Sequence, residues 1–182
     1  MEGKRVIIWV AGIGAALLLV IVLQEQWGTL RVGSAAPDFA ARISGGEIVR
    51  LADYVGRQNV VLFFYPKDFT TGCTSQACSF RDRFEELRGL NAALFGVSGD
   101  GEESHRRFAA TYGLPFSLIS DTDRSLARTY GVLRLGGLIP IPKRVTYVID
   151  KKGIIRLAAH DELSMERHVK DVVAVLRRLQ EE

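Results

Sequence analysis

Short apolar runs recur along the chain and predict buried strands. The runs NVVLFFY (59–65), AALFGVS (92–98) and RVTYVID (144–150) are rich in β-branched and aromatic residues. Continuous apolar runs of this length are typical of strands that are covered on both faces of a sheet. A fourth run, IIRLAA (154–159), follows a Lys-Lys-Gly turn and predicts a hairpin with the third run.

Amphipathic helices are predicted between and after these strands. Residues 75–89 carry apolar side chains spaced by three and four, and the pattern ends at a glycine. Further helices are predicted at 102–112, 123–130 and 164–180, the last with Ser164 as its N-cap. Strands that alternate with helices in this way predict an α/β fold, with helices on both faces of a central sheet.

The N-terminus shows a different pattern, because residues 6–23 are eighteen consecutive positions without a charged or strongly polar side chain. A helix of this length spans about 27 Å at ~1.5 Å per residue, close to the ~30 Å hydrocarbon core of a bilayer. Trp9 and Trp27 lie near its two ends, where indole rings favour the membrane interface. We therefore expect residues 1–30 to form a transmembrane anchor and linker, and residues 31–182 to form one folded domain.

A cleaved signal peptide and a buried core helix are the alternatives for this run. The following residues, 23–30, lack the small-residue pattern of a cleavage site, and the run lacks the polar stripe of a core helix. Lys4 and Arg5 precede the run, so the positive-inside tendency places the N-terminus in the cytoplasm. The domain is then expected on the extracytoplasmic side, which is periplasmic or at the cell surface.

Charge excludes one large class of function. The chain has 24 Lys and Arg against 21 Asp and Glu, a net charge of only +3. The basic residues are scattered among acidic ones and form no stripe, so we expect no nucleic-acid partner.

The two cysteines of the chain, Cys73 and Cys78, lie together in the segment 63–80. A strand, a loop and a helix follow one another there, and sites of α/β sheets form at the carboxyl ends of strands. Free N–H groups at a helix start favour a thiolate, which makes Cys73 a candidate nucleophile. In one helix, five residues separate two Cα atoms by about 7.5 Å along the axis, beyond the ~7 Å limit for a disulfide.

A bond between these cysteines therefore requires the helix start to unwind. This favours a pair that alternates between thiols and a disulfide, through a sulfenic acid, over a static structural disulfide. The C-x4-C spacing excludes a C-x-x-C redox motif. It also matches no zinc signature, because His105, His160 and His168 are distant in the chain and there is no second cysteine pair.

The segment PKDFTTGCT (66–74) resembles the P-x3-T-x2-C signature of peroxiredoxins, and SQACSFRD (75–82) resembles their bacterioferritin-comigratory or peroxiredoxin Q branch. The resemblance continues through APDF (36–39), GVSGD (96–100), SHRRF (104–108), LPFSLISD (114–121) and RVTYVIDKKG (144–153). It implies a thioredoxin-like fold with a central mixed sheet, and a peroxidase that reduces hydrogen peroxide and organic hydroperoxides. It also implies reduction by a thioredoxin-like partner, with neither metal nor organic cofactor, and we expect a monomer or weak dimer.

Carried over by position, the resemblance implies roles for five residues. Cys73 would be the peroxidatic cysteine, and Cys78 would resolve its sulfenic acid as an intramolecular disulfide. Thr70 would orient the peroxide, Arg144 would steady the thiolate and the peroxide oxygens, and Pro66 would shield the sulfur from water. Three of these residues also have an ordinary structural explanation: Pro66 as a strand end, Thr70 as an N-cap and Arg144 as a surface charge.

The chain departs from the family pattern in three places. Residue 71 is Thr where this branch commonly has Pro, and the anchor is absent from the common soluble pattern. The segment 132–144 is unusually apolar, so we expect it to pack on the membrane, a second subunit or the reductant. A second functional hypothesis is a membrane-anchored, redox-responsive interaction module with little peroxide turnover, and a third is a non-catalytic anchored domain with an inert disulfide.

Overall fold

The structure, a computed structural model, describes residues 29–162 and 164–182. The predicted transmembrane helix, residues 6–23, lies outside these ranges, as does nearly all of the predicted anchor and linker. Across the described part of the chain, no helix is both long and apolar enough to cross a membrane.

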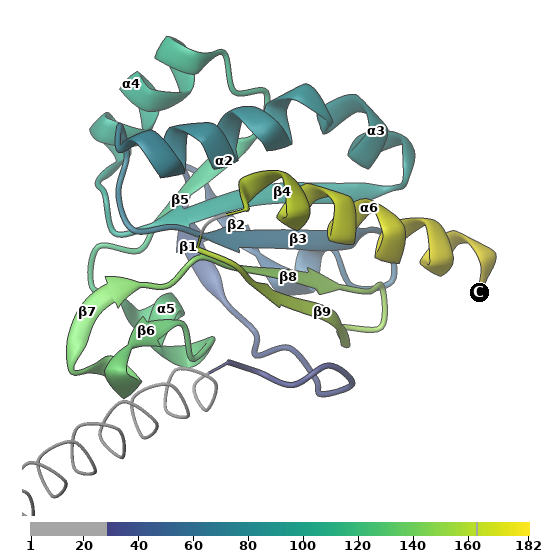
Figure 1. The fold of residues 1–182 in the computed structure, drawn as a ribbon. Helices are drawn as coiled ribbons and strands as arrows, with labels where there is room; N and C mark the ends of the chain where they lie inside the picture. The colour runs from purple at the N-terminus through teal and green to yellow at the C-terminus, as the bar shows by residue number, and fades with distance from the viewer. Residues whose placement is uncertain (1–28, 163) are drawn as a thin grey trace, which may run out of the picture.

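A five-stranded mixed sheet forms the centre of the domain, with the strand order β5-β4-β3-β8-β9 (Figure 1). Strand β3 pairs in parallel with β4 and antiparallel with β8. Strand β4 pairs in parallel with β5, and β8 pairs antiparallel with β9. The strands are β3 (Asn59–Phe64), β4 (Ala92–Ser98), β5 (Ser117–Ser120), β8 (Val145–Ile149) and β9 (Ile155–His160).

Helices cover both faces of this sheet, as the sequence predicts. One face packs against α2 (Thr71–Asp82), α3 (Phe84–Gly89), α4 (Glu102–Tyr112) and α6 (Met165–Glu181). The other face packs against α5 (Ser125–Thr129), the 3-10 helix η1 (Leu51–Asp53) and two small hairpins. These hairpins are β1 (Ala40–Arg42) with β2 (Ile48–Arg50), and β6 (Leu133–Arg134) with β7 (Ile139–Pro142), which are joined by the 3-10 helix η2 (Leu135–Gly137).

The position of β3, covered on both faces of the sheet, explains why its sequence is continuously apolar. All six of its residues are buried. Val61 and Phe63 enter the core under α2 and α6, whereas Val60, Leu62 and Phe64 enter the core on the opposite face. Because successive side chains of a strand point to opposite faces, a strand covered twice needs apolar residues at every position.

The predicted helix 75–89 is wrong in two respects. The helix begins earlier, at Thr71, and it breaks at Arg83, where φ is −114° and ψ is 9°. The apolar spacing continues across the break, so periodicity does not detect it. The early start includes Gly72, whose low helix propensity is overridden by tertiary packing.

The predicted helix 123–130 is shorter than expected. Arg124 has a left-handed backbone, with φ of 62°, so α5 begins one residue later. The Asp121 side chain caps the start of this helix. Its two carboxylate oxygens accept hydrogen bonds from the N–H groups of Leu126 and Ala127 at 2.9 and 2.8 Å. The apolar pattern of the sequence also did not predict β5 or the two small hairpins. Their strands are only two to four residues long.

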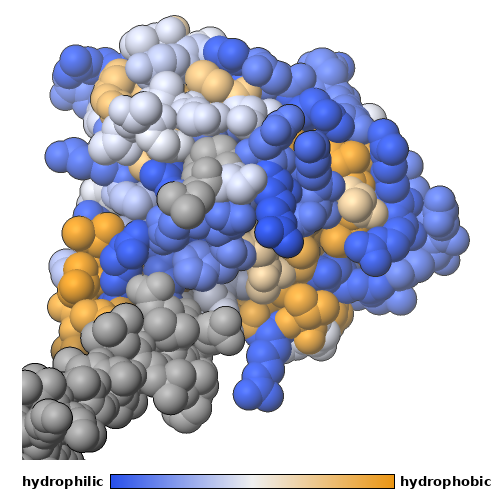
Figure 2. All heavy atoms as spheres, in the orientation of Figure 1, coloured by the Kyte–Doolittle hydropathy of each residue, from blue (hydrophilic) through white to orange (hydrophobic). Residues whose placement is uncertain are grey.

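The apolar segment 132–144 forms the β6–β7 hairpin and leaves part of its apolar surface open to solvent. Figure 2 shows a hydrophobic patch at the lower left, where Figure 1 places β7. What this surface packs against stays a prediction.

His168 joins the start of α6 to the sheet. Its Nδ1 lies 2.9 Å from the Thr146 hydroxyl of β8, and its Nε2 lies 2.8 Å from the carbonyl oxygen of Asp161. Nε2–H therefore donates to the carbonyl, and Nδ1 accepts from the hydroxyl. Burial lowers the pKa of His168 below its ordinary value, because the charged ring would lose its hydration.

We expect this histidine to make the fold sensitive to mild acid. Its folded-state pKa lies below the ~6.5 of an unfolded chain, so below that pH the unfolded state binds the extra proton and stability falls. Between about pH 6.5 and 5, the melting temperature of His168→Asn should therefore fall less than that of wild type. The pKa values of Asp68 and Glu162 are lowered, so the protonation of these carboxylates affects stability only at lower pH. Equal slopes of melting temperature against pH would contradict this account.

Candidate active site

Cys73 lies in the first turn of α2, immediately beyond the carboxyl end of β3. Thr70 precedes the helix in an extended conformation, and the N–H of Thr74 donates to its carbonyl oxygen at 2.9 Å. The N–H groups of residues 71, 72 and 73 therefore have no partner in the helical ladder. The Cys73 side chain is only 1% exposed. Its sulfur thus lies at the positive end of a twelve-residue helix, in a desolvated position.

Two side chains lie within hydrogen-bonding distance of this sulfur. Thr70 Oγ1 lies 2.8 Å from Cys73 Sγ, and Arg144 Nη2 lies 3.4 Å from it. Thr70 Oγ1 is also 3.1 Å from the carbonyl oxygen of Lys67. Since a hydroxyl has one hydrogen, Thr70 donates either to this carbonyl or to the sulfur. A thiolate, which only accepts, favours donation to the sulfur.

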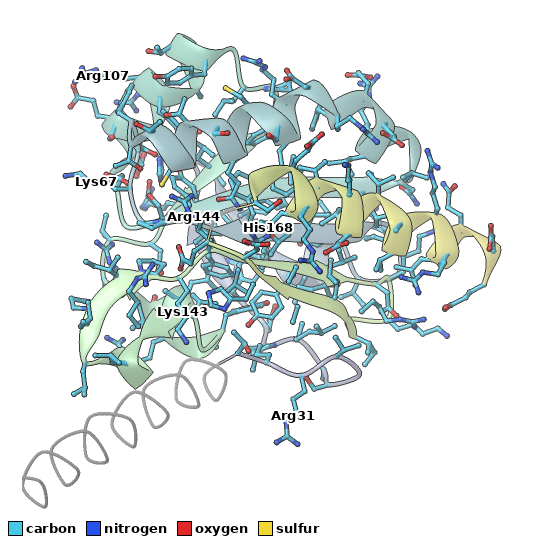
Figure 3. All side chains as sticks on the ribbon, viewed as in Figure 1. Arg31, Lys67, Arg107, Lys143, Arg144 and His168 are labelled. Carbon is cyan, nitrogen blue, oxygen red and sulfur yellow. The ribbon has the colours of Figure 1, made fainter. Side chains whose placement is uncertain are left out.

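The sheet explains how Arg144 reaches a cysteine 71 positions away. Strand β8 runs antiparallel to β3, with Val145 paired to Phe64. The residue that precedes β8 therefore lies beside the residue that follows β3. Figure 3 shows Arg144 between the sheet and the start of α2.

Neighbouring side chains hold the guanidinium in place. Arg144 Nη1 donates to Gln76 Oε1 at 3.3 Å, and Arg144 Nε lies 3.6 Å from Glu162 Oε2. Glu162 also accepts from Arg134 Nη2 at 2.7 Å. Burial raises the pKa of Glu162, but hydrogen bonding to His160, the charge of Arg134 and the Arg144 backbone N–H outweigh burial and lower it. An ionised carboxylate thus fixes Arg144 from the side away from the sulfur.

Gly72 makes room for this arrangement. A Cβ atom at position 72 would lie 2.7 Å from Arg144 Nη2, the nitrogen that donates to Cys73. Any larger residue must displace either the guanidinium or the helix start.

A buried polar network holds the loop between β3 and α2. Asp68 accepts hydrogen bonds from the Tyr65 hydroxyl at 2.8 Å and from the Ser104 hydroxyl at 2.7 Å. His105 Nδ1 lies 2.9 Å from the same carboxylate. His105 Nε2 lies 3.2 Å from the carbonyl oxygen of Ile119. Burial raises the pKa of Asp68, but the hydrogen bond and charge of His105 outweigh burial and lower it. The network ties the loop to α4 and β5, and so positions Thr70.

Cys78 lies in the same helix and is half-buried. Both cysteines are free thiols, five residues apart within the continuous helix Thr71–Asp82. The predicted helix, 75–89, contained only Cys78, and the earlier start of α2 at Thr71 places both cysteines in one helix. A bond between them therefore requires the first turns of α2 to unwind.

The structure brings together three of the five predicted site residues, Cys73, Thr70 and Arg144, within direct contact. Cys78 follows in the same helix, and the half-buried Pro66 opens the loop, where its shielding role stays a prediction. Within residues 29–162 and 164–182, no three His, Cys, Asp or Glu side chains gather as metal ligands would.

Sequence reasoning missed the residues that support this contact. Gln76 had a signal, because it lies three positions after Cys73 and is a polar residue on a buried helix face. Asp68 stood inside the quoted motif without being assigned a role. Glu162 had no signal, since its partners lie 18 and 28 positions away.

Fold and site together define a thiol peroxidase on a thioredoxin-like scaffold, with its reactive cysteine at the start of the helix after a central strand. The AhpC/TSA family matches residues 32–158. The chain therefore belongs to the AhpC/TSA family, and its relatives place it with the peroxiredoxin Q proteins.

Two relatives and two solved structures illustrate this. The chloroplastic peroxiredoxin Q of Oryza sativa subsp. japonica is 40% identical over 153 residues, 84% of this chain and 69% of that protein. The Arabidopsis thaliana protein is 41% identical over 146 residues, 80% of this chain and 66% of that protein. Peroxidoxin BcpB of Mycobacterium tuberculosis superposes with a TM-score of 0.76 at 34% identity, covering 82% of this chain and 97% of that one. Peroxiredoxin Q of Xanthomonas campestris gives 0.73 at 30% identity, covering 83% and 97%.

Gly72→Ala tests whether the Arg144 contact matters for the reaction. We expect the second-order rate of Cys73 oxidation by hydrogen peroxide to fall by about 10- to 100-fold, because a small displacement of a positioning group has effects of this order. The rate is measured by competition with a peroxidase of known rate. Gly89→Ala is the control, because a Cβ there meets nothing within 4 Å. Equal rates in the two variants would refute the role of this contact.

Proposed function

We propose that Cys73 is the peroxidatic cysteine of this thiol peroxidase and that Cys78 resolves it. The observation that carries this proposal is the convergence of Thr70 Oγ1 and Arg144 Nη2 on the Cys73 sulfur, at 2.8 and 3.4 Å. The enzyme class implies a hydroperoxide as the substrate and a thioredoxin-type protein as the reductant.

In the first step the Cys73 thiolate attacks the terminal oxygen of the hydroperoxide. An S–O bond forms as the O–O bond breaks, and the leaving oxygen takes a proton to become water or an alcohol. Negative charge moves from sulfur to oxygen, so donors that also meet the peroxide oxygens stabilise the transition state. Arg144, Thr70 and the unpaired N–H groups at the start of α2 are these donors.

In the second step α2 unwinds at its start, and the Cys78 thiol attacks the sulfenic acid. An S–S bond forms, the S–O bond breaks, and water leaves. A dithiol of the reductant then opens the disulfide by exchange and is itself oxidised. The speed of unwinding decides between disulfide formation and a second oxidation of Cys73.

Mass spectrometry of the full-length protein after one equivalent of hydrogen peroxide tests both roles. Wild type is expected to lose two hydrogens and to form a disulfide between Cys73 and Cys78. Cys78→Ser is expected to gain one or two oxygens at Cys73, because no resolving thiol is present. Cys73→Ser is expected to stay unmodified. An unmodified Cys73 in wild type would instead favour the redox-responsive interaction module.

We also propose that residues 6–23 anchor the protein in a membrane, with the domain 31–182 on the extracytoplasmic side. The eighteen uncharged residues and the preceding Lys4 and Arg5 support this assignment. The N–H of Leu30 donates to the Tyr147 hydroxyl at 3.0 Å, so the chain already contacts the folded domain at this residue. The domain is expected to be a monomer or weak dimer.

Alkaline extraction of membranes, followed by intact-mass measurement, tests the anchor. The full-length protein should stay in the membrane pellet with residues 1–23 present. A variant that lacks residues 6–23 should be released. External protease should remove the domain in right-side-out vesicles only. A shortened mass would show a cleaved signal peptide, and a released full-length chain would show that the segment is no anchor.

A further inference from the structure

The β6–β7 hairpin, residues 133–142, exposes three large apolar side chains within four positions. Leu138 is 84% exposed, Ile139 37% and Ile141 46%. They coincide with the hydrophobic patch at the lower left of Figure 2. Single exposed apolar residues are ordinary, but a contiguous group indicates a contact surface.

The hairpin is held so that these side chains point outward. Its turn passes through three residues with positive φ, Leu135 at 47°, Gly136 at 65° and Gly137 at 99°. Arg124 Nε, from the loop before α5, donates to the carbonyl oxygen of Pro140 at 3.1 Å. The backbone of the hairpin is therefore tied from behind, and its apolar side is left open.

The described chain begins beside the base of this hairpin. The N–H of Leu30 donates to the Tyr147 hydroxyl at 3.0 Å. This hydroxyl in turn donates to the carbonyl oxygen of Tyr130 at 2.8 Å. Two residues further on, the carbonyl oxygen of Val132 accepts the N–H of Lys143, which closes the hairpin base. Leu30 and the hairpin thus belong to the same side of the sheet (Figure 1).

This connection limits how far the hairpin can lie from the end of the apolar run. Seven residue steps join Leu23 to Leu30, about 25 Å when fully extended. Any bilayer that contains residues 6–23 therefore lies within this distance of Leu30, which itself packs on the same side of the sheet as the hairpin.

Charge around the hairpin suits a membrane surface. The segment from Arg124 to Ile149 contains no Asp or Glu and five basic residues, Arg124, Arg128, Arg134, Lys143 and Arg144, while Asp121 and Asp123 directly precede it. The last two are buried, whereas the three arginines of residues 124–134 are half-buried or exposed. Glu162 neutralises only part of this charge, through its ion pairs with Arg134 and Arg144. Basic segments flanking apolar side chains bind anionic bilayers.

We propose that the β6–β7 hairpin docks on the lipid bilayer, with Leu138, Ile139 and Ile141 at the headgroup boundary and the exposed Arg128 toward anionic headgroups. The inference rests on the anchor proposed above and adds a second, shallow membrane contact. Three residue steps join Ile141 to Arg144, at most about 11 Å of chain. Docking therefore places the Cys73 site near the bilayer surface, where hydroperoxides of lipid acyl chains emerge.

A tryptophan reporter on the hairpin tests the docking directly. In the full-length chain Trp9 and Trp27 are replaced by Phe, and Leu138→Trp supplies the indole. The protein is reconstituted in vesicles of phosphatidylcholine and phosphatidylglycerol that contain brominated lipid, a short-range quencher. We expect strong quenching and a blue shift of the emission. The control reporter is Arg88→Trp in α3, on the opposite face of the sheet, where the side chain is 68% exposed and should not be quenched.

Sedimentation of the vesicles separates the possible outcomes. Protein that sediments with the vesicles while the indole of the Leu138→Trp variant is unquenched overturns the docking and leaves the anchor intact. Protein that stays in the supernatant overturns both. A blue shift without quenching, together with a dimer in detergent, assigns the patch to a second copy of the chain and also overturns the docking.

Activity provides a second, independent measurement. Leu138→Ser with Ile141→Ser should reduce the rate on phospholipid hydroperoxide in vesicles by about five-fold or more, because the site loses its proximity to the lipid. The rate with hydrogen peroxide should stay unchanged, since these side chains touch no reacting group. A parallel loss with both substrates, or no loss with either, would contradict the proposed orientation.

Discussion

The contact between the Arg144 guanidinium and the Cys73 sulfur is the interaction on which the site depends. Antiparallel pairing of β3 with β8 brings the two residues together, and Glu162 and Gln76 hold the guanidinium from its other sides. A positive charge already in place needs little reorganisation when negative charge moves from sulfur to peroxide oxygen. Gly72 leaves space for this guanidinium, because a Cβ atom there would lie 2.7 Å from Arg144 Nη2.

The segment that carries this contact has two opposing requirements. Attack on the peroxide needs an intact first turn of α2, since its free N–H groups and Thr70 face the sulfur. Resolution by Cys78 needs the same turn to open, because both cysteines lie in one continuous helix. The buried Asp68–His105 network holds the loop before the helix from the α4 and β5 side. The loop before the helix therefore has supports that do not depend on the first turn of α2.

The same polypeptide links the reaction centre to the surface. The β6–β7 hairpin leads directly into Arg144, so an apolar, basic surface lies a few residues from the group that activates the sulfur. Arg134 of this hairpin shares the Glu162 carboxylate with Arg144. The proposed membrane contact and the arginine beside the sulfur therefore belong to one continuous segment of the chain.

Local sequence determined the features that depend on neighbours in the chain: the four long strands, the positions of α4 and α6, and a cysteine at a helix start after β3. Tertiary structure alone decided the early start of α2, the break at Arg83, the short edge strand β5, and the ties that Glu162 makes to Arg144. The physical reason is that apolar periodicity and helix signals act over a few residues, whereas these features arise from contacts between distant segments. A two- to four-residue strand or a single ion pair leaves no periodic trace in the sequence.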